Sequence, residues 1–128
     1  MFELHVETEF AAAHAISMGG RMEPLHGHNW HVTVCVAGDR LDDDGLVCDF
    51  HLIESHLRDL VGVFHNRNLN ETAPFDETNP TAELVARHIA ETLQNRIADR
   101  VPEGVRISWV SVTEAPGCTA VYRMPTES

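Results

Sequence analysis

Three histidines at short spacing are the residues of this sequence best suited to hold a metal ion. His26 and His28 are two residues apart, so on a β-strand their side chains point to the same face. His14 can join them if the strand that it ends pairs antiparallel with theirs. A catalytic zinc ion commonly takes three protein ligands and keeps one open position, and neutral imidazole is a favoured donor. Three inward imidazoles without a metal would be costly to bury, so we expect a zinc site here.

Two carboxylates are candidates for the chemistry around that ion. Glu23 stands three residues before His26, where it could act as a general base or be a solvated acid of a turn. Glu114 follows Val110 and Val112 at even positions of the apolar segment WVSVTEAPGC, so it shares their strand face. A carboxylate on an apolar face is expected to bind a polar partner or a ligand. The alternative is that Glu114 only begins the turn to the next strand.

The remaining histidines carry weaker signals. His65 precedes Asn66 just after an expected helix, where a cation and a capping residue are ordinary features of a helix C-terminus. Four others are expected to be ordinary hydrogen-bonded histidines without a metal, namely His5, His51, His56 and His88. The spacing of the histidines does not distinguish zinc from copper or nickel. Zinc is favoured because it is more available.

Two strands must position the three histidines. From Phe2 to His14 apolar residues recur at even positions, which is the period of a half-buried strand that ends with His14 on its apolar face. A Gly-rich turn at Met18–Met22 leads to a second strand, in which His26 to Val36 again shows the two-residue period. The two strands thus bring His14, His26 and His28 to one side.

Helices and further strands complete the expected fold. Asp49 is expected to cap one helix, and Asn79 with Pro80 at the first helical position is expected to start another that stops before Pro102. Strands at Val105–Glu114 and Thr119–Met124 follow. The order predicts one α+β domain over residues 1–128, with two helices on one face of a four-stranded antiparallel sheet. Its uncovered edges favour a homo-oligomer.

Composition narrows the partners and the location. The 128 residues carry 9 basic and 20 acidic side chains, and a formal charge of -11 opposes the phosphate contacts that nucleic-acid binding needs. The three cysteines form no CxxC pair, which fits a reducing compartment. Neither a membrane-spanning apolar run nor a signal-peptide pattern occurs, so we expect a cytoplasmic protein that binds neither nucleic acid nor membrane.

Motifs along nearly the whole chain resemble the 6-pyruvoyl-tetrahydropterin synthase and 6-carboxy-tetrahydropterin synthase family. They occur in the family's order and include the segment LHGHN, which holds two of the three histidines. The matching segments are Phe10–His14, Leu25–Asn29, Val47–Phe50, Leu69–Asn70, Asn79–Glu83 and Val112–Glu114, with Tyr122 beyond.

The resemblance implies the tunnelling fold, in which the small sheets of several subunits join into a barrel, usually a hexamer built as a dimer of trimers. It also implies that His14, His26 and His28 bind zinc and that the substrate is a reduced pterin. Glu114 matches the carboxylate that anchors the pterin ring, and Thr81 falls in a segment that lines the pterin pocket.

The sequence departs from this family at the groups that transfer protons. Met22 stands where the family has a catalytic cysteine, and His65-Asn66 stands where it has an Asp-His pair. Glu23 is retained as Glu-x-x-His-Gly-His, which resembles a branch in which glutamate replaces the cysteine. That branch cleaves the dihydroneopterin side chain by a retro-aldol reaction to give 6-hydroxymethyl-dihydropterin, a precursor of folate.

Three functions therefore stay open at the level of sequence. Retro-aldol cleavage of dihydroneopterin or its triphosphate is slightly preferred, with Glu23 as base and His65 returning the proton. A lyase that forms 6-carboxy- or 6-pyruvoyl-tetrahydropterin is the first alternative. A catalytically inactive oligomer that binds pterin or zinc is the second, because both the thiol and the Asp-His pair are absent.

Overall fold

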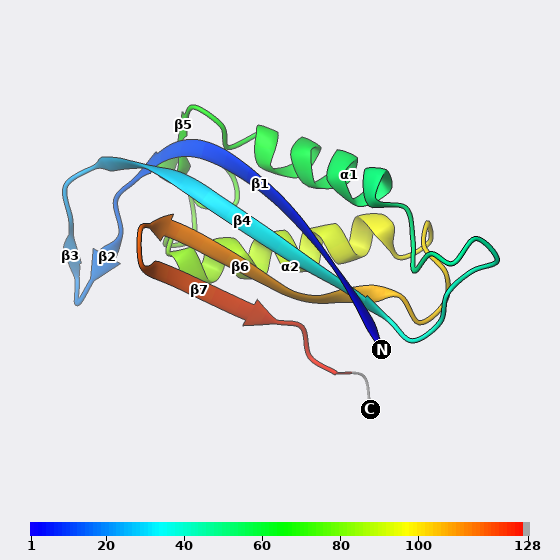
Figure 1. Cartoon of the computed structure of the whole chain (residues 1–128). Helices are drawn as coiled ribbons and strands as arrows, with labels where there is room; N and C mark the ends of the chain where they lie inside the picture. Colours follow the sequence, from blue (N-terminus) through cyan, green and yellow to red (C-terminus); the bar gives the residue numbers. More distant parts are fainter. Residues whose placement is uncertain (127–128) are drawn as a thin grey trace.

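The structure is a computed structural model that describes residues 1–126 of the chain. One sheet runs along the molecule, and both long helices lie on the same side of it (Figure 1). The elements are, in chain order, β1 (Phe2–His14), β2 (Ser17–Met18), β3 (Arg21–Met22), β4 (His26–Gly38), α1 (Phe50–Gly62), β5 (Arg67–Asn68), a short 3-10 helix (Leu69–Glu71), α2 (Ala82–Ile97), β6 (Arg106–Ala115) and β7 (Cys118–Arg123).

The sheet has the strand order β5-β1-β4-β6-β7. All neighbours pair antiparallel except β5, whose Arg67–Asn68 pairs parallel with Ala12 and Ala13 of β1. The expected α+β fold with two helices on one face of the sheet is confirmed. The four expected strands are present, and the correction is a fifth, two-residue strand at the edge of β1.

The β1–β4 pair fixes the faces of the sheet. Its register places Phe2 opposite Gly38 and His14 opposite His26 without interruption. The buried side chains of β1 are all even-numbered, as the two-residue period predicts, namely Val6, Phe10, Ala12 and His14. Phe10 stacks on Trp30 of β4 at a centroid distance of 5.7 Å. Odd-numbered side chains of both strands therefore lie on the open face.

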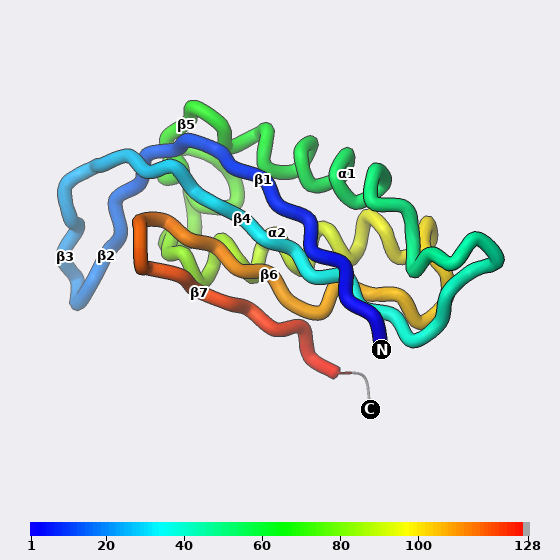
Figure 2. The backbone as a smooth tube through the Cα atoms, in the orientation of Figure 1, coloured from blue at the N-terminus to red at the C-terminus, as the bar shows by residue number. Residues whose placement is uncertain are grey.

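The connection between β1 and β4 is more regular than expected. The predicted turn at Met18–Met22 contains the two short strands β2 and β3, which form a separate ribbon that projects from one end of the sheet (Figure 2). Gly19 and Gly20 make its turn with φ of 58° and 82°, a backbone conformation that glycine adopts without steric cost. Met18 and Met22 are exposed on the ribbon.

Each long helix begins at a side-chain cap. Asp49 caps α1 as predicted, because its carboxylate accepts the backbone N–H of His51 at 2.9 Å. The predicted start of α2 is wrong: Thr81 is the cap, and its hydroxyl accepts the N–H of Leu84 at 3.1 Å. Asn79 cannot serve as the cap because its carboxamide binds the backbone of Ser17 instead.

The core lies between the sheet and the two helices. Its largest fully buried members include Trp30, Phe10, Phe64, Ile53, Leu57, Ile89 and Leu93. This apolar layer, rather than any disulfide, holds the sheet in place, since all three cysteines are free. Among residues 1–126, no helix combines the length and the apolar character needed to cross a membrane.

Candidate metal centre and adjoining cavity

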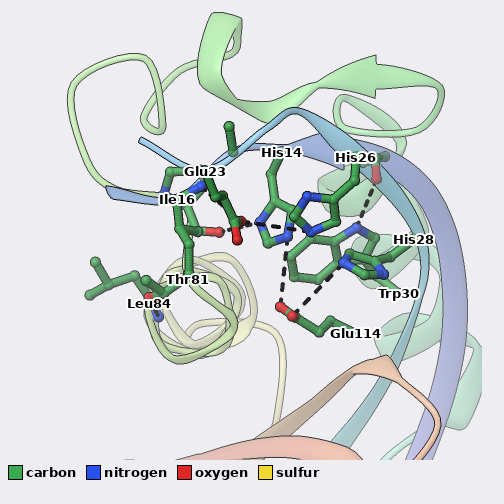
Figure 3. Close-up of polar contacts among 12 residues, drawn as sticks. His14, Ile16, Glu23, His26, His28, Trp30, Thr81, Leu84 and Glu114 are labelled. Atoms are coloured by element: carbon green, nitrogen blue, oxygen red, sulfur yellow. Dashed lines mark hydrogen bonds and ion pairs between the residues drawn. The ribbon is translucent and has the colours of Figure 1, made fainter. Parts of the chain in front are cut away.

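His14, His26 and His28 come together at the end of the β1–β4 pair next to the β2–β3 ribbon (Figure 3). Their ring centroids lie 4.6 to 5.2 Å apart, with the rings near perpendicular to one another. One nitrogen from each ring lies within 4.8 Å of the other two. The predicted constellation therefore forms within a single chain, and each ring presents an edge to a common point.

Backbone carbonyls fix the protonation of two of these rings. His14 Nδ1 lies 2.8 Å from the carbonyl oxygen of Pro80, and His26 Nδ1 lies 2.9 Å from that of Pro24. A carbonyl only accepts hydrogen bonds, so Nδ1 carries the proton in both neutral rings and Nε2 carries the lone pair. This is the arrangement that metal-binding histidines commonly have.

The Nε2 atoms of His14 and His28 are buried and have no hydrogen-bond partner. His14 is 0% exposed, so bulk solvent does not supply a hydrogen bond to its Nε2 atom. An unpaired buried polar atom costs about 1–3 kcal/mol. The donor set of three imidazoles fits a zinc ion, which would give the unpaired Nε2 atoms of His14 and His28 a partner.

Trp30 forms the floor of the cluster. Its ring packs edge-on against His14 at 4.7 Å, and its indole N–H donates to the carbonyl of Ala12 at 3.1 Å. Burial lowers the pKa of His28, Glu114 partly opposes that effect, and the neighbouring His26 and His14 add to it. The ring of His28 is thereby kept neutral, which is the form that binds metals.

Glu114 faces the cluster from β6. Its two carboxylate oxygens lie 3.9 Å from the Nε2 atoms of His14 and His28. The pairing of β6 with β7 slips here, since Thr113 is opposite Thr119 while Ala115 is opposite Cys118, which leaves Glu114 as the extra residue. Such bulges re-aim a side chain, and this one directs the carboxylate towards the histidines (Figure 3).

Glu23 lies on the other side of the cluster, just after the β2–β3 ribbon. Its Oε1 is 3.7 Å from His26 Nε2 and accepts the backbone N–H of Ile16 at 3.0 Å. The Glu23 N–H donates in turn to the Ile16 carbonyl at 3.0 Å. Two bonds to one residue hold the carboxylate beside the cluster, so its place does not depend on a flexible turn.

A cavity of about 660 Å³ opens between Glu114 and the start of α2. Thr81 lines it, but the Thr81 hydroxyl already accepts the helix N–H of Leu84. The lining residues are Ile16, Ser17, Met18, Thr81, Ala82, Glu83, Glu114, Gly117, Cys118, Thr119, Ala120 and Val121. The cavity can admit a flat bicyclic ligand whose edge meets Glu114.

His65 is not brought into this cluster within one chain. It is exposed after α1, and its Nδ1 accepts the backbone N–H of Ala11 at 3.1 Å on the outer edge of β1. Asn66 next to it has a φ of 59° and lines a second cavity with Arg67 and His28. The two residues thus flank the histidine cluster from outside the sheet.

Two asparagines that support the centre were not predicted as site residues. Asn70 binds both the N–H and the carbonyl of Ala15 at 2.8 Å, and Asn79 does the same for Ser17 at 2.9 Å. Both bonds of each asparagine fix the chain just after His14. The sequence offers no spacing signal for such side chain–backbone pairs, because their partners are far along the chain.

Fold and site together define a class of protein: a small α+β protein with a cluster of three histidines that could hold a metal ion, next to a cavity. A family model described as 6-pyruvoyl tetrahydropterin synthase matches residues 3–125. The chain belongs to the 6-pyruvoyl tetrahydropterin synthase family, as the sequence motifs predict.

Relatives and solved structures agree with this assignment. The chain is 31% identical to a 6-carboxy-5,6,7,8-tetrahydropterin synthase of Bacillus subtilis, over 95% of this chain and 85% of the relative. A Synechocystis protein of the same name is 33% identical over 73% of this chain and 76% of its own. The structure of Caenorhabditis elegans 6-pyruvoyl tetrahydropterin synthase superposes with a TM-score of 0.83 at 21% identity, covering 97% of this chain and 96% of the other.

A Plasmodium vivax 6-pyruvoyltetrahydropterin synthase also shares the fold. It has a TM-score of 0.76 at 20% identity and covers 98% of both chains. Its solved structures include variants in which a residue described as catalytic, a glutamate, is replaced by alanine or by cysteine. At these identities the solved structures establish the tunnelling fold of this chain.

Proposed function

We propose that this protein is a zinc-dependent lyase that acts on the side chain of dihydroneopterin or its triphosphate, with retro-aldol cleavage preferred. The observation that carries the proposal is the pair of buried, unpartnered Nε2 atoms of His14 and His28 next to the cavity that contains Glu114. Zinc held by His14, His26 and His28 would act as a Lewis acid on side-chain oxygens of the substrate.

Glu114 anchors the pterin in this proposal. An ionised carboxylate accepts two hydrogen bonds, here from the 2-amino group and the adjacent ring N–H of the pterin. The cavity beside it has room for the ring, and Thr81 lies on its wall at the start of α2. The side chain of the substrate then extends from the anchored ring towards the three histidines.

Glu23 is the proposed base. In the cleavage, Glu23 takes the proton from the hydroxyl on the second side-chain carbon, the bond between the first and second carbons breaks, and the first carbon is protonated. The products are 6-hydroxymethyl-dihydropterin and glycolaldehyde, or the phosphorylated aldehyde. Met22 cannot accept a proton, whereas the Glu23 carboxylate is held 3.7 Å from His26 Nε2.

Conversion to 6-carboxy- or 6-pyruvoyl-tetrahydropterin is the alternative. The names of the Bacillus subtilis and Synechocystis relatives favour the 6-carboxy product. The Plasmodium vivax protein has a glutamate that is described as catalytic, which supports a glutamate as the base in the present chain as well. A catalytically inactive pterin-binding oligomer is the remaining alternative and is motivated by Met22 and Asn66 at the positions of the family's proton-transfer groups.

We also propose a homo-oligomer, with a hexamer of two trimers as the expected form. The outer edges of β7 and of the first half of β1 carry no neighbouring strand in the described part of the chain. His65 contacts β1 at Ala11, outside the histidine cluster of its own chain, so it would return a proton to substrate only in a site shared with a neighbouring subunit. Sedimentation of the zinc-loaded protein measures the number of subunits.

Product analysis tests the proposed reaction. Zinc-loaded protein is incubated with dihydroneopterin and separately with its triphosphate, and the pterin products are identified by mass. We expect 6-hydroxymethyl-dihydropterin, and 6-carboxy-tetrahydropterin as the sole product would refute the retro-aldol assignment. Glu23→Gln keeps the size of the side chain and removes the base, so turnover should stop while zinc content stays unchanged.

A further inference from the structure

A second cluster of metal-binding side chains lies on the open face of the same two strands. His5 of β1 is directly opposite Cys35 of β4, and Cys35 is directly opposite Trp109 of β6. Glu3 precedes His5 by two residues and therefore shares its face. The sheet thus brings a carboxylate, an imidazole and a thiol together.

The distances within this cluster suit a single ion. One potential ligand atom from each of Glu3, His5 and Cys35 lies within 4.8 Å of the other two. Glu3 Oε1 and His5 Nε2 are 3.4 Å apart. Two ligands of one tetrahedral zinc are separated by about 3.3–3.7 Å, given bond lengths of about 2.0–2.3 Å. The Glu3–His5 pair is already at that separation, so only the thiol must approach.

The thiol is covered but not sealed from an ion. Cys35 is 0% exposed, and the rings of His5 and Trp109 meet at a centroid distance of 5.1 Å on the same face. His5 is itself one of the three ligands, and its side chain is 50% exposed. An ion that binds between Glu3 and His5 can therefore be approached from solvent on the side of these two ligands.

The surroundings of Cys35 favour the protonated thiol when no metal is bound. Burial raises the pKa of Cys35 to about 11, the Glu3 carboxylate adds to this effect, and Arg123 partly offsets it. A divalent cation replaces that proton, because thiolate is the form that coordinates metals. Metal uptake at Cys35 would thus release one proton.

We propose that Glu3, His5 and Cys35 form a second zinc site, distinct from the three-histidine centre and independent of the proposed reaction. The ligand set of one thiolate, one imidazole and one carboxylate suits zinc and excludes the hard cations calcium and magnesium. His14 is nine positions after His5 in β1, which is about 30 Å along a strand, and the two sets face opposite sides of the sheet.

The second site ties the first half of β1 to β4. In the described chain β5 covers only Ala12 and Ala13 of β1, so the outer edge of Phe2–Ala11 has no neighbouring strand. An ion that joins Glu3 and His5 to Cys35 adds a cross-strand link to this half of the strand. Zinc that binds only the folded chain also raises its midpoint of thermal unfolding.

Metal stoichiometry tests the second site. The whole protein is stripped with a chelator, reloaded with zinc, freed of excess metal and measured for zinc per chain by mass spectrometry. Two equivalents are expected for the wild type, and one for Cys35→Ser or His5→Gln. His5→Gln changes a half-exposed side chain, so it gives an answer even if Cys35→Ser at the buried position fails to fold.

Cobalt substitution identifies the ligands. Cobalt bound at Cys35 gives thiolate-to-metal charge-transfer absorption, which the three-histidine centre cannot give. The band should be lost in Cys35→Ser and His5→Gln and kept in Cys118→Ser, which removes the exposed thiol. His31→Gln is the matched control, because His31 pairs with Glu7 at 3.2 Å on the same face without a cysteine.

Two results would overturn the inference. One is a single equivalent of zinc in the wild type together with no charge-transfer band. The other is a second equivalent that survives in both His5→Gln and Cys35→Ser. His28→Ala removes the zinc of the first centre only, so one equivalent and the cobalt band should remain in that variant whatever reaction the enzyme catalyses.

Discussion

The two clusters of potential metal ligands use the same pair of strands in different ways. On the helix side, His14 and His28 bury Nε2 atoms that have no partner, and backbone carbonyls hold the rings of His14 and His26. On the open face, His5 already has a polar neighbour in Glu3, and both side chains are about half exposed.

The three-histidine cluster therefore leaves polar atoms unsatisfied unless an ion is bound. The open-face cluster has no such unsatisfied atom. Each unpaired buried nitrogen costs about 1–3 kcal/mol, and a metal ion removes that cost. The open-face cluster has no unpaired buried nitrogen. Zinc that binds there must therefore replace existing hydrogen bonds and contacts with water. We therefore expect the three-histidine centre to bind zinc more tightly than the Glu3–His5–Cys35 site.

Removing a histidine ligand should have the largest effect. His28→Ala is expected to lower zinc affinity at the first centre by more than about 100-fold, because loss of even an outer-shell partner costs about 10–100-fold. Turnover should disappear with the metal. Zinc titration and activity measure both, and His31→Ala on the opposite face of β4 serves as the control. Equal zinc binding in the two variants would contradict the assignment of the centre.

The next largest effect is expected at the pterin anchor. Glu114→Ala removes two charge-assisted hydrogen bonds of about 1.5 kcal/mol or more each, so pterin affinity should fall by about 100-fold or more. Zinc content should stay unchanged, since Glu114 is not one of the three ligands. Binding of a pterin that cannot react is measured by calorimetry. Glu114→Gln should fall between wild type and Glu114→Ala, because a carboxamide oxygen still accepts one bond.

A smaller effect is expected at the cap of α2. Thr81→Ala should lower the free energy of unfolding by about 1 kcal/mol, because the N–H of Leu84 loses its acceptor. Thr81→Ser keeps the hydroxyl and should match the wild type in urea unfolding. Because Pro80 holds the ring of His14, Thr81→Ala should also weaken zinc retention slightly. An unchanged midpoint in urea would contradict the observed cap.

The smallest effect is expected at a partly buried histidine outside both clusters. His88 of α2 packs against Phe64 and Phe75 at centroid distances of 5.8 and 5.6 Å. Burial lowers its pKa, with Glu91 partly opposing the shift, so the unfolded chain takes up its proton first as the pH falls. Stability should therefore decrease from about pH 6.5 downwards until the folded protein is protonated too.

Substitution isolates this contribution. In His88→Gln the free energy of unfolding, followed by urea unfolding at several pH values, should depend less on pH below about 6.5 than in the wild type. His51→Gln, which alters a side chain that is 89% exposed, is the control. An identical pH dependence in all three proteins would mean that His88 keeps its ordinary pKa.

The sequence predicted the sheet well because two-residue periodicity is local information. Parity alone placed His14, His26 and His28 on one face, and the β1–β4 register bears this out. The start of α2 was predicted wrongly for a nonlocal reason: Asn79 is a good capping residue, but its carboxamide is taken by Ser17, which lies far away in sequence.

The other features that the sequence does not predict also depend on pairing between distant residues. The bulge at Glu114 depends on the pairing of β7 with β6, and no residue type in the segment predicts it, although alternation already places Glu114 on the face of Val110 and Val112. Similarly, the odd position of Cys35 in β4 indicates the face opposite His26 and His28, but its neighbours Glu3 and His5 are identified only by the register of β1 against β4. Local sequence patterns predict the face of the sheet on which a side chain lies. The residue that lies beside it on the neighbouring strand is known only from the folded structure.

Alternation along β4 also limits how the length of this chain can change. The residues from His26 to Cys35 pair with β1 without a bulge, so deletion of one residue between them would turn one of the two clusters to the wrong face. The loop between Gly38 and Asp49 carries no such constraint on side-chain direction. Insertions and deletions should therefore be tolerated in that loop and should abolish metal binding within β4.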